Sequence, residues 1–265
     1  MNKTVSFKSH RDLIKNLGES DAIVEFTEVA VRLFIAQANE SGSFNNYLSK
    51  QSEKYSIRVN SIEQGKFRQN ISKGYIITVS QNMEQFFKAL QIDYLNLFEI
   101  DWKFLPDGMT RLDFILGKLK AYDEIDIDKV LVSIFKYYSY IRNSYAHGGD
   151  RDHDKEFKGI QNYLPDIKER YELNAPNHFD NITFDDFVLF TRVSKDLAHN
   201  ITKNAYNKVI ENNLVCKYIV RKQLSERYPR STKRGYKALV GFINTEFGLG
   251  HDYANYVVSL CPSLH

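Results

Sequence analysis

Apolar residues recur at intervals of three and four along most of the chain, which is the spacing of one face of an α-helix. Five segments carry this pattern, at about 20–38, 65–98, 110–122, 127–147 and 183–212. Residues 40–64 are polar and rich in Ser and Asn, so there we predict a long loop or short strand pieces. Helix breakers are scarce, because the 265 residues include only 13 Gly and 5 Pro. The sequence therefore predicts an all-α fold.

The first two segments carry broad apolar stripes. In 20–38 the stripe consists of Ile23, Phe26, Val29, Ala30, Leu33 and Phe34. In 65–98 it includes Met83, Phe86, Phe87, Leu90, Ile92 and Leu95. Both stripes are typical of amphipathic helices.

The segment 127–147 has the most regular pattern in the chain. Its apolar residues follow one another at spacings of four, three, four, three and four, which favours a helix of an antiparallel bundle. These residues are Ile127, Leu131, Ile134, Tyr138, Ile141 and Tyr145. We expect Asp126 to cap the start of the helix, and Gly148 or Gly149 to end it in the left-handed conformation.

A second long helix is predicted to begin at Thr183, because Asp186 follows at the spacing of a capping box. The polar stretch before it contains Pro165 and Pro176 and predicts a link between the two helices. We divide the chain into an N-terminal helical extension (1–65), a helical bundle (66–213) and a basic C-terminal helical extension (214–265).

The C-terminal extension differs from the rest of the chain in charge. Between residues 216 and 237 eight basic residues stand beside a single acidic one, Glu226, whereas the whole chain has a net charge of only +3. The eight are Lys217, Arg221, Lys222, Arg227, Arg230, Lys233, Arg234 and Lys237. Because cations bind phosphates and the interleaved Tyr218, Tyr228 and Tyr236 could stack on unpaired bases, we interpret the segment as RNA-binding. A charged surface helix pair is the alternative.

Cysteines and hydropathy bear on the cellular location. Cys216 and Cys261 lie far apart in the sequence and fit no CxxC pattern, so we expect two lone thiols in a reducing compartment. The first ten residues lack the apolar stretch of a signal peptide, and no run approaches the roughly 18 apolar residues of a membrane span. We therefore expect a soluble, cytoplasmic protein that does not contact a membrane.

The end of the 127–147 helix carries residues suited to RNA cleavage. At about 100° per residue, Asn143 and His147 share a face opposite the apolar residues, and Arg142 lies at the edge of that apolar face. His147 stands at the helix C-terminus, where the dipole favours its protonated form by up to about 2 kcal/mol. Metal-free RNA cleavage needs a group that moves protons and a fixed cation that stabilises the phosphorane. His147 and Arg142 have these properties, although their spacing equally permits a surface ion pair of Arg142 and a merely exposed His147.

The segment from Arg142 to His147, RNSYAH, resembles the RNxxxH signature of the HEPN superfamily. The surrounding helices resemble the HEPN context over about residues 67–212. This resemblance implies a homodimeric helical bundle in which two copies of the motif share a cleft. It also implies a metal-independent endoribonuclease without a cofactor, of the kind found in toxin–antitoxin systems and anti-phage defence, that leaves 2′,3′-cyclic phosphate ends.

The resemblance assigns a role to each residue of the motif. Arg142 becomes the cation that holds the phosphate and the transition state, and His147 becomes the proton-transfer residue. Asn143 orients His147 or the phosphate. One HEPN subgroup is silenced by nucleotidylation of a tyrosine two residues after the histidine, but this chain has Gly149 there.

Other interpretations stay open. One alternative is a non-catalytic HEPN-like dimer that binds nucleotide, RNA or a toxin or antitoxin partner. Another is a DNA-binding regulator that uses the basic C-terminal segment; a helix-turn-helix at 223–258 has no turn signature beyond 230–235. The stretch 147–154 is dense in His and Asp but lacks the ligand spacing of a zinc site, so we favour a solvated loop without metal. We expect His199 to be an exposed helix residue.

Overall fold

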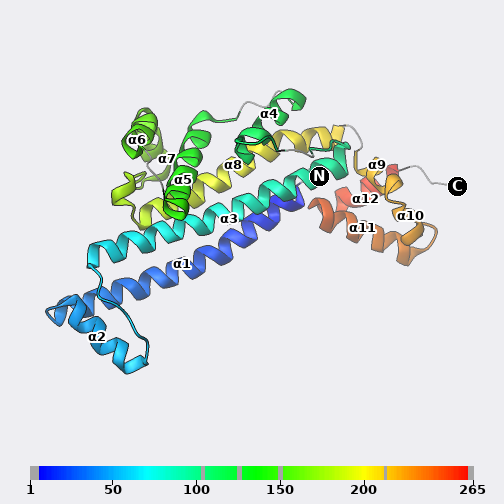
Figure 1. Cartoon of the computed structure of the whole chain (residues 1–265). Helices are drawn as coiled ribbons and strands as arrows, with labels where there is room; N and C mark the ends of the chain where they lie inside the picture. The colour runs from blue at the N-terminus through cyan, green and yellow to red at the C-terminus, as the bar shows by residue number, and fades with distance from the viewer. Residues whose placement is uncertain (1–5, 103–104, 124–126, 149–151, 212–213, 262–265) are drawn as a thin grey trace. The chain divides into compact units, whose positions relative to one another are not determined.

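The computed structural model describes residues 6–102, 105–123, 127–148, 152–211 and 214–261 (Figure 1). These residues form helices and no strand, which confirms the predicted all-α class. The α-helices are α1 (Lys8–Glu40), α2 (Phe44–Tyr55), α3 (Gln64–Phe98), α4 (Arg111–Asp123), α5 (Lys129–His147), α6 (His153–Ile160), α7 (Leu164–Tyr171), α8 (Phe184–Glu211), α9 (Leu214–Arg221), α10 (Leu224–Arg227), α11 (Lys233–Phe247) and α12 (His251–Leu260). Two short 3₁₀ helices are η1 (Gln161–Tyr163) and η2 (Phe179–Asn181).

The helices pack into two compact units. Unit 1 consists of Met1–Lys15, Met83–Asp128 and Asp196–His265, and unit 2 consists of Asn16–Asn82 and Lys129–Lys195. Each of α1, α3 and α8 therefore contributes residues to both units. The division into three consecutive segments, 1–65, 66–213 and 214–265, stays a prediction.

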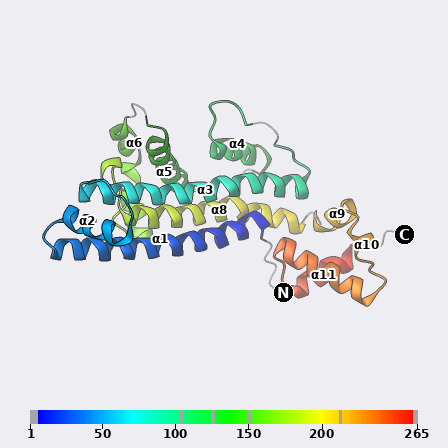
Figure 2. The ribbon, with the colours of Figure 1, turned by 60° about the horizontal axis from the view of Figure 1, so that its bottom comes forward.

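Unit 2 is built around portions of α1, α3 and α8, which Figures 1 and 2 both draw side by side. Tyr75 of α3 and Phe187 of α8 have ring centroids 5.8 Å apart. Lys195 Nζ of α8 lies 2.8 Å from Asp21 Oδ2 of α1. Helix α5 packs on the same α8, since the Tyr138 and Phe190 ring centroids are 4.9 Å apart. Aromatic contacts thus join α5, which carries the HEPN-like motif, to the core of this unit.

A buried carboxylate fixes the start of α8 and its contact with α5. The predicted pairing of Thr183 with Asp186 at the start of the helix is confirmed, because Thr183 N donates to Asp186 Oδ2 at 2.8 Å. Asp186 also accepts hydrogen bonds from Tyr138 Oη at 2.9 Å and from Asn177 N at 2.8 Å. Burial raises the pKa of Asp186, while its hydrogen bonds act in the opposite direction. The Asn177 side-chain amide donates at 2.8 Å and the Thr183 hydroxyl at 3.1 Å. Five donors from α5, the preceding loop and the helix start therefore converge on the Asp186 carboxylate.

Unit 1 contains the C-terminal helices. Helix α11 packs on α12, and α12 packs on α9. A disulfide joins Cys216 of α9 to Cys261, whose Cα atoms are 5.1 Å apart. The prediction of two lone thiols is therefore wrong: the packing of α12 on α9 brings the cysteines within the range that a disulfide spans. The argument for a reducing compartment, which depended on free thiols, loses its basis.

The loop or strand pieces predicted at 40–64 are wrong for 44–55, which form helix α2, whereas 57–63 form a loop as predicted. The Ser43 side chain caps the helix by accepting from Asn46 N at 3.4 Å. Phe44 and Tyr47 pack their rings on Phe34 of α1, at centroid distances of 5.9 and 5.0 Å. Contacts between aromatic rings of α2 and α1 thus compensate for a polar local sequence.

The polar stretch 152–182 likewise forms short helices, α6, η1, α7 and η2, where we expected only a link. Within the residues described, none of the helices combines the length and apolarity needed to cross a membrane.

Candidate functional site

Helix α5 buries most of its predicted apolar residues. Leu131, Ile134, Tyr138 and Ile141 are at most 1% exposed. Tyr145, however, is 39% exposed, although it points to the same side of the helix. The packing on this side stops before the last turn, so the expectation that Tyr145 belongs to the buried face is wrong. The last turn of α5 therefore presents an aromatic ring to solvent beside the motif.

Arg142 and Asn143 lie half-buried in the last two turns of α5. Arg142 Nη1 donates to Asn143 Oδ1 at 2.7 Å. The guanidinium makes no ion pair with a carboxylate among the described residues, which do not include Asp150. A guanidinium has five N–H donors, and among the described residues the Arg142 side chain uses one of them, in the hydrogen bond to Asn143.

His147 is exposed and is the last residue of α5. Gly148 adopts the left-handed conformation with φ 64°, and its N–H donates to Ser144 O at 3.0 Å. The predicted glycine cap is thus confirmed at Gly148, whereas Gly149 and the expected cap Asp126 lie outside the described residues. His147 shares a face with Asn143, but the hydrogen bond of Asn143 goes to Arg142.

Unit 2 places further titratable residues around α5 that sequence reasoning missed. Tyr140, one turn before Ser144, has its ring centroid 5.5 Å from that of His153 on α6. The His153 ring stacks on Phe179 at 3.9 Å. His178 Nε2 lies 3.1 Å from Asp154 Oδ1. No signal in the sequence links these residues, because they come from three separate segments.

The acidic residues after the motif have structural roles in α6. Asp152 Oδ1 accepts from Lys155 N at 2.9 Å and thereby caps the helix. Asp154 follows in the first turn, where the helix dipole favours negative charge. No group of His, Cys, Asp or Glu among the described residues is arranged to hold a metal ion. Residues 149–151, which belong to the predicted solvated loop, lie outside the described ranges.

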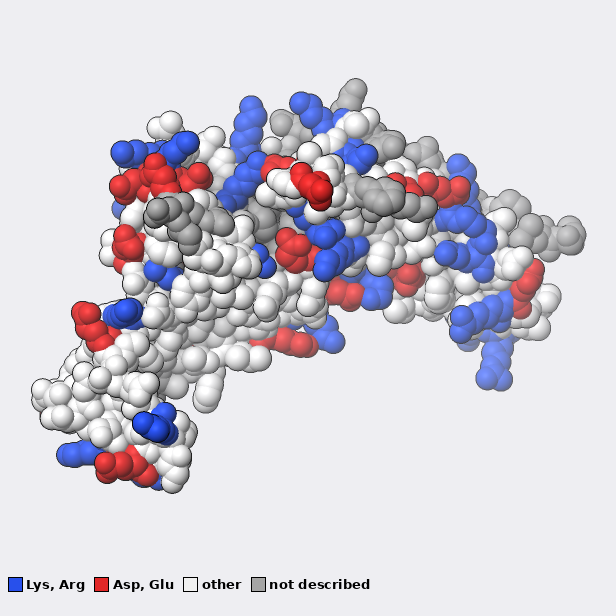
Figure 3. Space-filling model, viewed as in Figure 1, with Lys and Arg blue, Asp and Glu red and all other residues white. Residues whose placement is uncertain are grey.

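The eight basic residues of the C-terminal extension do not share one environment. On the face in Figure 3, Lys and Arg predominate over the C-terminal helices. Arg221 pairs with Glu99, and Arg230 Nη1 donates to Cys261 O at 2.6 Å. Four others, Lys217, Lys233, Arg234 and Lys237, are exposed and make no ion pair with a described residue. Lys222 and Arg227 lie over tyrosine rings, at 5.9 and 5.4 Å from the ring centroids.

The tyrosines of this segment are less accessible than we expected. Tyr218 is only 7% exposed and packs edge-on against Phe247, with ring centroids 5.2 Å apart. It cannot stack on a base without leaving the core, so that expectation is wrong for Tyr218. Tyr228 is half-buried against Phe242, at a centroid distance of 5.9 Å.

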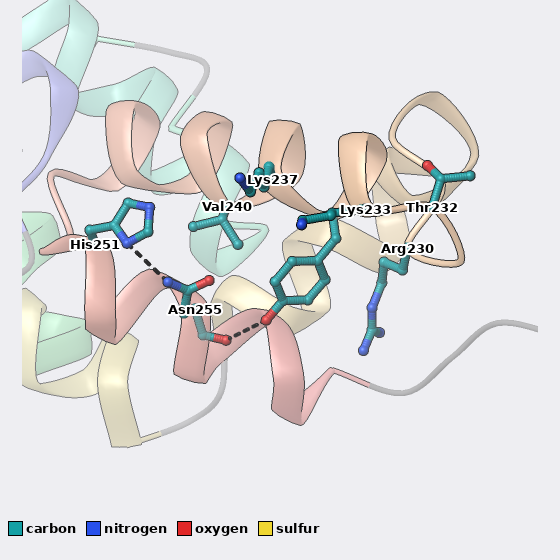
Figure 4. A pocket seen from close by; sticks show the side chains of 8 residues that line it. Arg230, Thr232, Lys233, Lys237, Val240, His251 and Asn255 are labelled. Atoms are coloured by element: carbon teal, nitrogen blue, oxygen red, sulfur yellow. Dashed lines mark hydrogen bonds between the residues drawn. The ribbon is translucent and has the colours of Figure 1, made fainter.

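A pocket of about 650 Å³ brings together part of the basic segment (Figure 4). Its lining consists of Arg230, Thr232, Lys233, Tyr236, Lys237, Val240, His251 and Asn255. Three of the predicted RNA-binding residues thus meet here. His251 and Asn255, which lie four residues apart on α12, were missed; His251 is exposed and Asn255 half-buried. His199 is exposed on α8, as expected.

Comparisons with known proteins identify no relative: no protein-family model, no curated protein and no solved structure matches this chain.

Proposed function

We propose that this protein is a HEPN-like, metal-independent endoribonuclease. The observation that carries the proposal is that the last two turns of one helix hold both an exposed histidine, His147, and an arginine, Arg142. Arg142 makes no ion pair with a carboxylate among the described residues. A surface ion pair, the simplest alternative role for Arg142, has no support among those residues. An uncompensated guanidinium favours phosphate, which it binds through two parallel N–H···O hydrogen bonds.

In the proposed reaction the substrate supplies its own nucleophile. The 2′-oxygen forms a bond to the phosphorus atom and the bond from phosphorus to the 5′-oxygen breaks, which leaves a 2′,3′-cyclic phosphate. His147 takes the proton from the 2′-hydroxyl or gives one to the departing 5′-oxygen. Arg142 stabilises the phosphorane, and Asn143 holds the guanidinium in place through its hydrogen bond. The exposed ring of Tyr145 offers a base a surface for stacking.

We also propose that the active form is a homodimer. Helix α1 exposes an uncharged stripe in unit 2, in which Phe26 is 76%, Ile23 67%, Leu33 60% and Val29 56% exposed. Ala22, Ala30 and Ala36 continue the stripe and are also exposed. Monomers rarely expose contiguous apolar patches of this kind. Spacings of three and four suit a second copy of the same helix, packed about a two-fold axis.

Such an activity suits a toxin or anti-phage defence protein that is held in check by a cognate antitoxin or regulatory protein.

The test is incubation of the purified protein with total RNA and with tRNA in EDTA, followed by mapping of the cut ends. We expect wild type to produce 2′,3′-cyclic phosphate ends. His147→Ala and Arg142→Ala should fold normally and lose cleavage by about 10²-fold or more, the usual contribution of proton transfer or of one transition-state contact. His199→Ala is the matched control, because it removes another exposed helical histidine and should leave cleavage unchanged.

Cleavage that persists in His147→Ala, or that requires a metal ion, would contradict the mechanism. An Arg142→Ala variant that fails to fold would assign Arg142 a structural role.

A non-catalytic nucleotide- or RNA-binding module is the second candidate function. It is favoured by the cationic pocket of unit 1, which contains none of the motif residues. It predicts RNA binding without cleavage, equal in wild type and His147→Ala.

A further inference from the structure

The pocket between α11 and α12 is built from residues that carry positive charge or donate hydrogen bonds. Arg230, Lys233 and Lys237 supply three cations, and none of the described residues that line the pocket is acidic. In Figure 4 the cations come from α11 and the turn before it, while His251 and Asn255 come from α12. The whole pocket lies within unit 1.

The charges of α11 are arranged unfavourably for the helix itself. Lys233 and Arg234 occupy its first two positions, and its first turn contains no acidic residue. The positive end of the helix dipole lies there and favours anions instead. Lys233 and Lys237 are four residues apart, so two like charges are neighbours on the helix surface. Both are exposed and make no ion pair with a described residue. A bound anion would relieve each of these repulsions.

The uncharged part of the lining is held in place by hydrogen bonds. Tyr236 Oη donates to Asn255 O at 3.2 Å, which joins α11 to α12 (Figure 4). Asn255 Nδ2 lies 2.9 Å from His251 Nδ1. An amide nitrogen is a donor, so Nδ1 accepts this bond and the neutral His251 carries its hydrogen on Nε2. His251 thereby offers a further N–H donor beside the lysines.

The size of the pocket argues against a bare ion as its ligand. Small-molecule pockets usually enclose about 300–1,000 Å³, and about 650 Å³ falls within that range. The half-buried ring of Tyr236 adds apolar surface next to the cations. A ligand that combines a phosphate with a flat base matches both parts of the lining.

We propose that this pocket binds the phosphate monoester of a nucleotide, present either as a free nucleotide or as the 5′-terminal phosphate of RNA. Lys233 and Lys237 hold the phosphate, and the base lies beside Tyr236. This proposal does not depend on cleavage by the α5 motif, since it concerns binding at residues of unit 1.

The test measures binding of a fluorescent RNA octamer with 2′-O-methyl groups, which blocks cleavage by 2′-hydroxyl attack. The full-length protein is titrated with this octamer carrying a 5′-phosphate and with the same octamer carrying a 5′-hydroxyl. We expect the phosphorylated form to bind about tenfold more tightly or better, as the loss of charge-assisted hydrogen bonds implies. Adenosine 5′-monophosphate should compete and adenosine should not.

Two double variants with the same loss of charge locate the site. Lys233→Gln/Lys237→Gln should abolish the preference for the 5′-phosphate. Lys217→Gln/Lys222→Gln changes basic residues of the same segment outside the pocket and should preserve the preference. All four side chains are exposed, so both variants are expected to unfold at the wild-type temperature.

The outcomes separate the two sources of the phosphate. If the monophosphate binds as tightly as the octamer, the ligand is a free nucleotide; if the octamer binds much more tightly, the ligand is an RNA end. Equal affinity for both octamers, an equal loss in both double variants, or no competition by the monophosphate would overturn the proposal. None of these results changes the outcome of the cleavage test on His147→Ala.

Discussion

The turn before the cationic pocket depends on one residue without a side chain. Gly235 lies in the first turn of α11, where a Cβ atom would stand 2.1 Å from Pro229 O and 2.8 Å from Pro229 C. Thr232 Oγ1 accepts from Gly235 N at 3.0 Å, so the turn and the helix are also joined by a hydrogen bond. Because Pro229 O is a backbone atom, it cannot rotate away as a flexible side chain would. Gly235 thus allows the close approach that brings Arg230 to the pocket.

We predict that Gly235→Ala destabilises unit 1 and weakens ligand binding in the pocket. The expected loss is about 1–3 kcal/mol, the usual cost of forcing an extra methyl group into a packed site. Gly241→Ala is the matched control in the same helix, since nothing lies within 4 Å of its Cβ position. There we expect a gain of about 0.5–1 kcal/mol from helix propensity. Urea unfolding of both variants measures the difference, and equal stabilities would contradict this account of Gly235.

The motif residues show how far a sequence predicts individual positions. Helical periodicity correctly predicted that His147 is exposed and that Arg142 lies at the edge of the buried face. It could not predict that Asn143 accepts a hydrogen bond from Arg142, because adjacent residues on a helix do not face each other. The bond forms because the arginine side chain is long enough to bend towards its neighbour. Nor could periodicity predict the exposure of Tyr145, which depends on where the neighbouring helices end.

At the scale of elements, the pattern located the long helices and the buried side of α5, but not the buried side of α1. Helix α1 has two apolar sides in unit 2: Val24, Val31 and Ile35 are buried, whereas Phe26 and Leu33 on the predicted stripe are exposed. Periodicity alone cannot choose between two such sides. The choice depends on α3 and α8, which are distant in the sequence. Similarly, α2 is stabilised by ring contacts with α1 that no local pattern contains.

The exposed stripe of α1 leads to a prediction about assembly. We expect wild type to be a dimer by light scattering after size exclusion, and Phe26→Lys to be a folded monomer. Truncating a central interface residue costs about 2 kcal/mol or more, and burying a lysine at the contact adds to this. Since Phe26 is 76% exposed within the chain, the substitution should leave the fold intact.

Glu25→Lys introduces the same residue one position away, off the stripe, and should stay dimeric. A monomeric wild type, or a dimer that survives Phe26→Lys, would show that a second copy does not cover this face.

At the scale of the whole molecule, the division into units could not be predicted from the order of the helices. Unit 1 joins the first residues of α1 to residues near both the middle and the end of the chain. Ser9 N, for example, donates to Asp93 Oδ2 at 3.0 Å, across 84 positions of sequence. The disulfide between Cys216 and Cys261 has the same origin, because α12 must first pack on α9. Such contacts depend on tertiary packing, which composition and periodicity do not predict.

Unit 1 also contains a group that should make the stability of the protein sensitive to acid. Burial, together with the nearby charges of His199 and Arg11, lowers the pKa of His10 from 6.5 to about 4. Between these two pH values the unfolded chain binds a proton at His10 that the folded chain does not bind. The free energy of unfolding is therefore not reduced by His10 above pH 6.5, and it falls progressively as the pH decreases from 6.5 towards 4. Asp93, whose pKa is raised by burial, acts in the opposite direction, so the contribution of His10 has to be isolated by substitution.

We predict that His10→Gln loses less stability than wild type between pH 7 and pH 4. One pKa unit corresponds to about 1.4 kcal/mol, and after allowance for solvent screening of this half-buried group we expect a difference of about 1–2 kcal/mol. The chain's single tryptophan, Trp102, is 6% exposed and stacks on Tyr94 within unit 1, so its fluorescence during urea unfolding reports on the unit that contains His10. Parallel pH profiles for wild type and His10→Gln would mean that His10 protonates equally in the folded and unfolded chains, and the acid sensitivity of unit 1 would then have to come from another group.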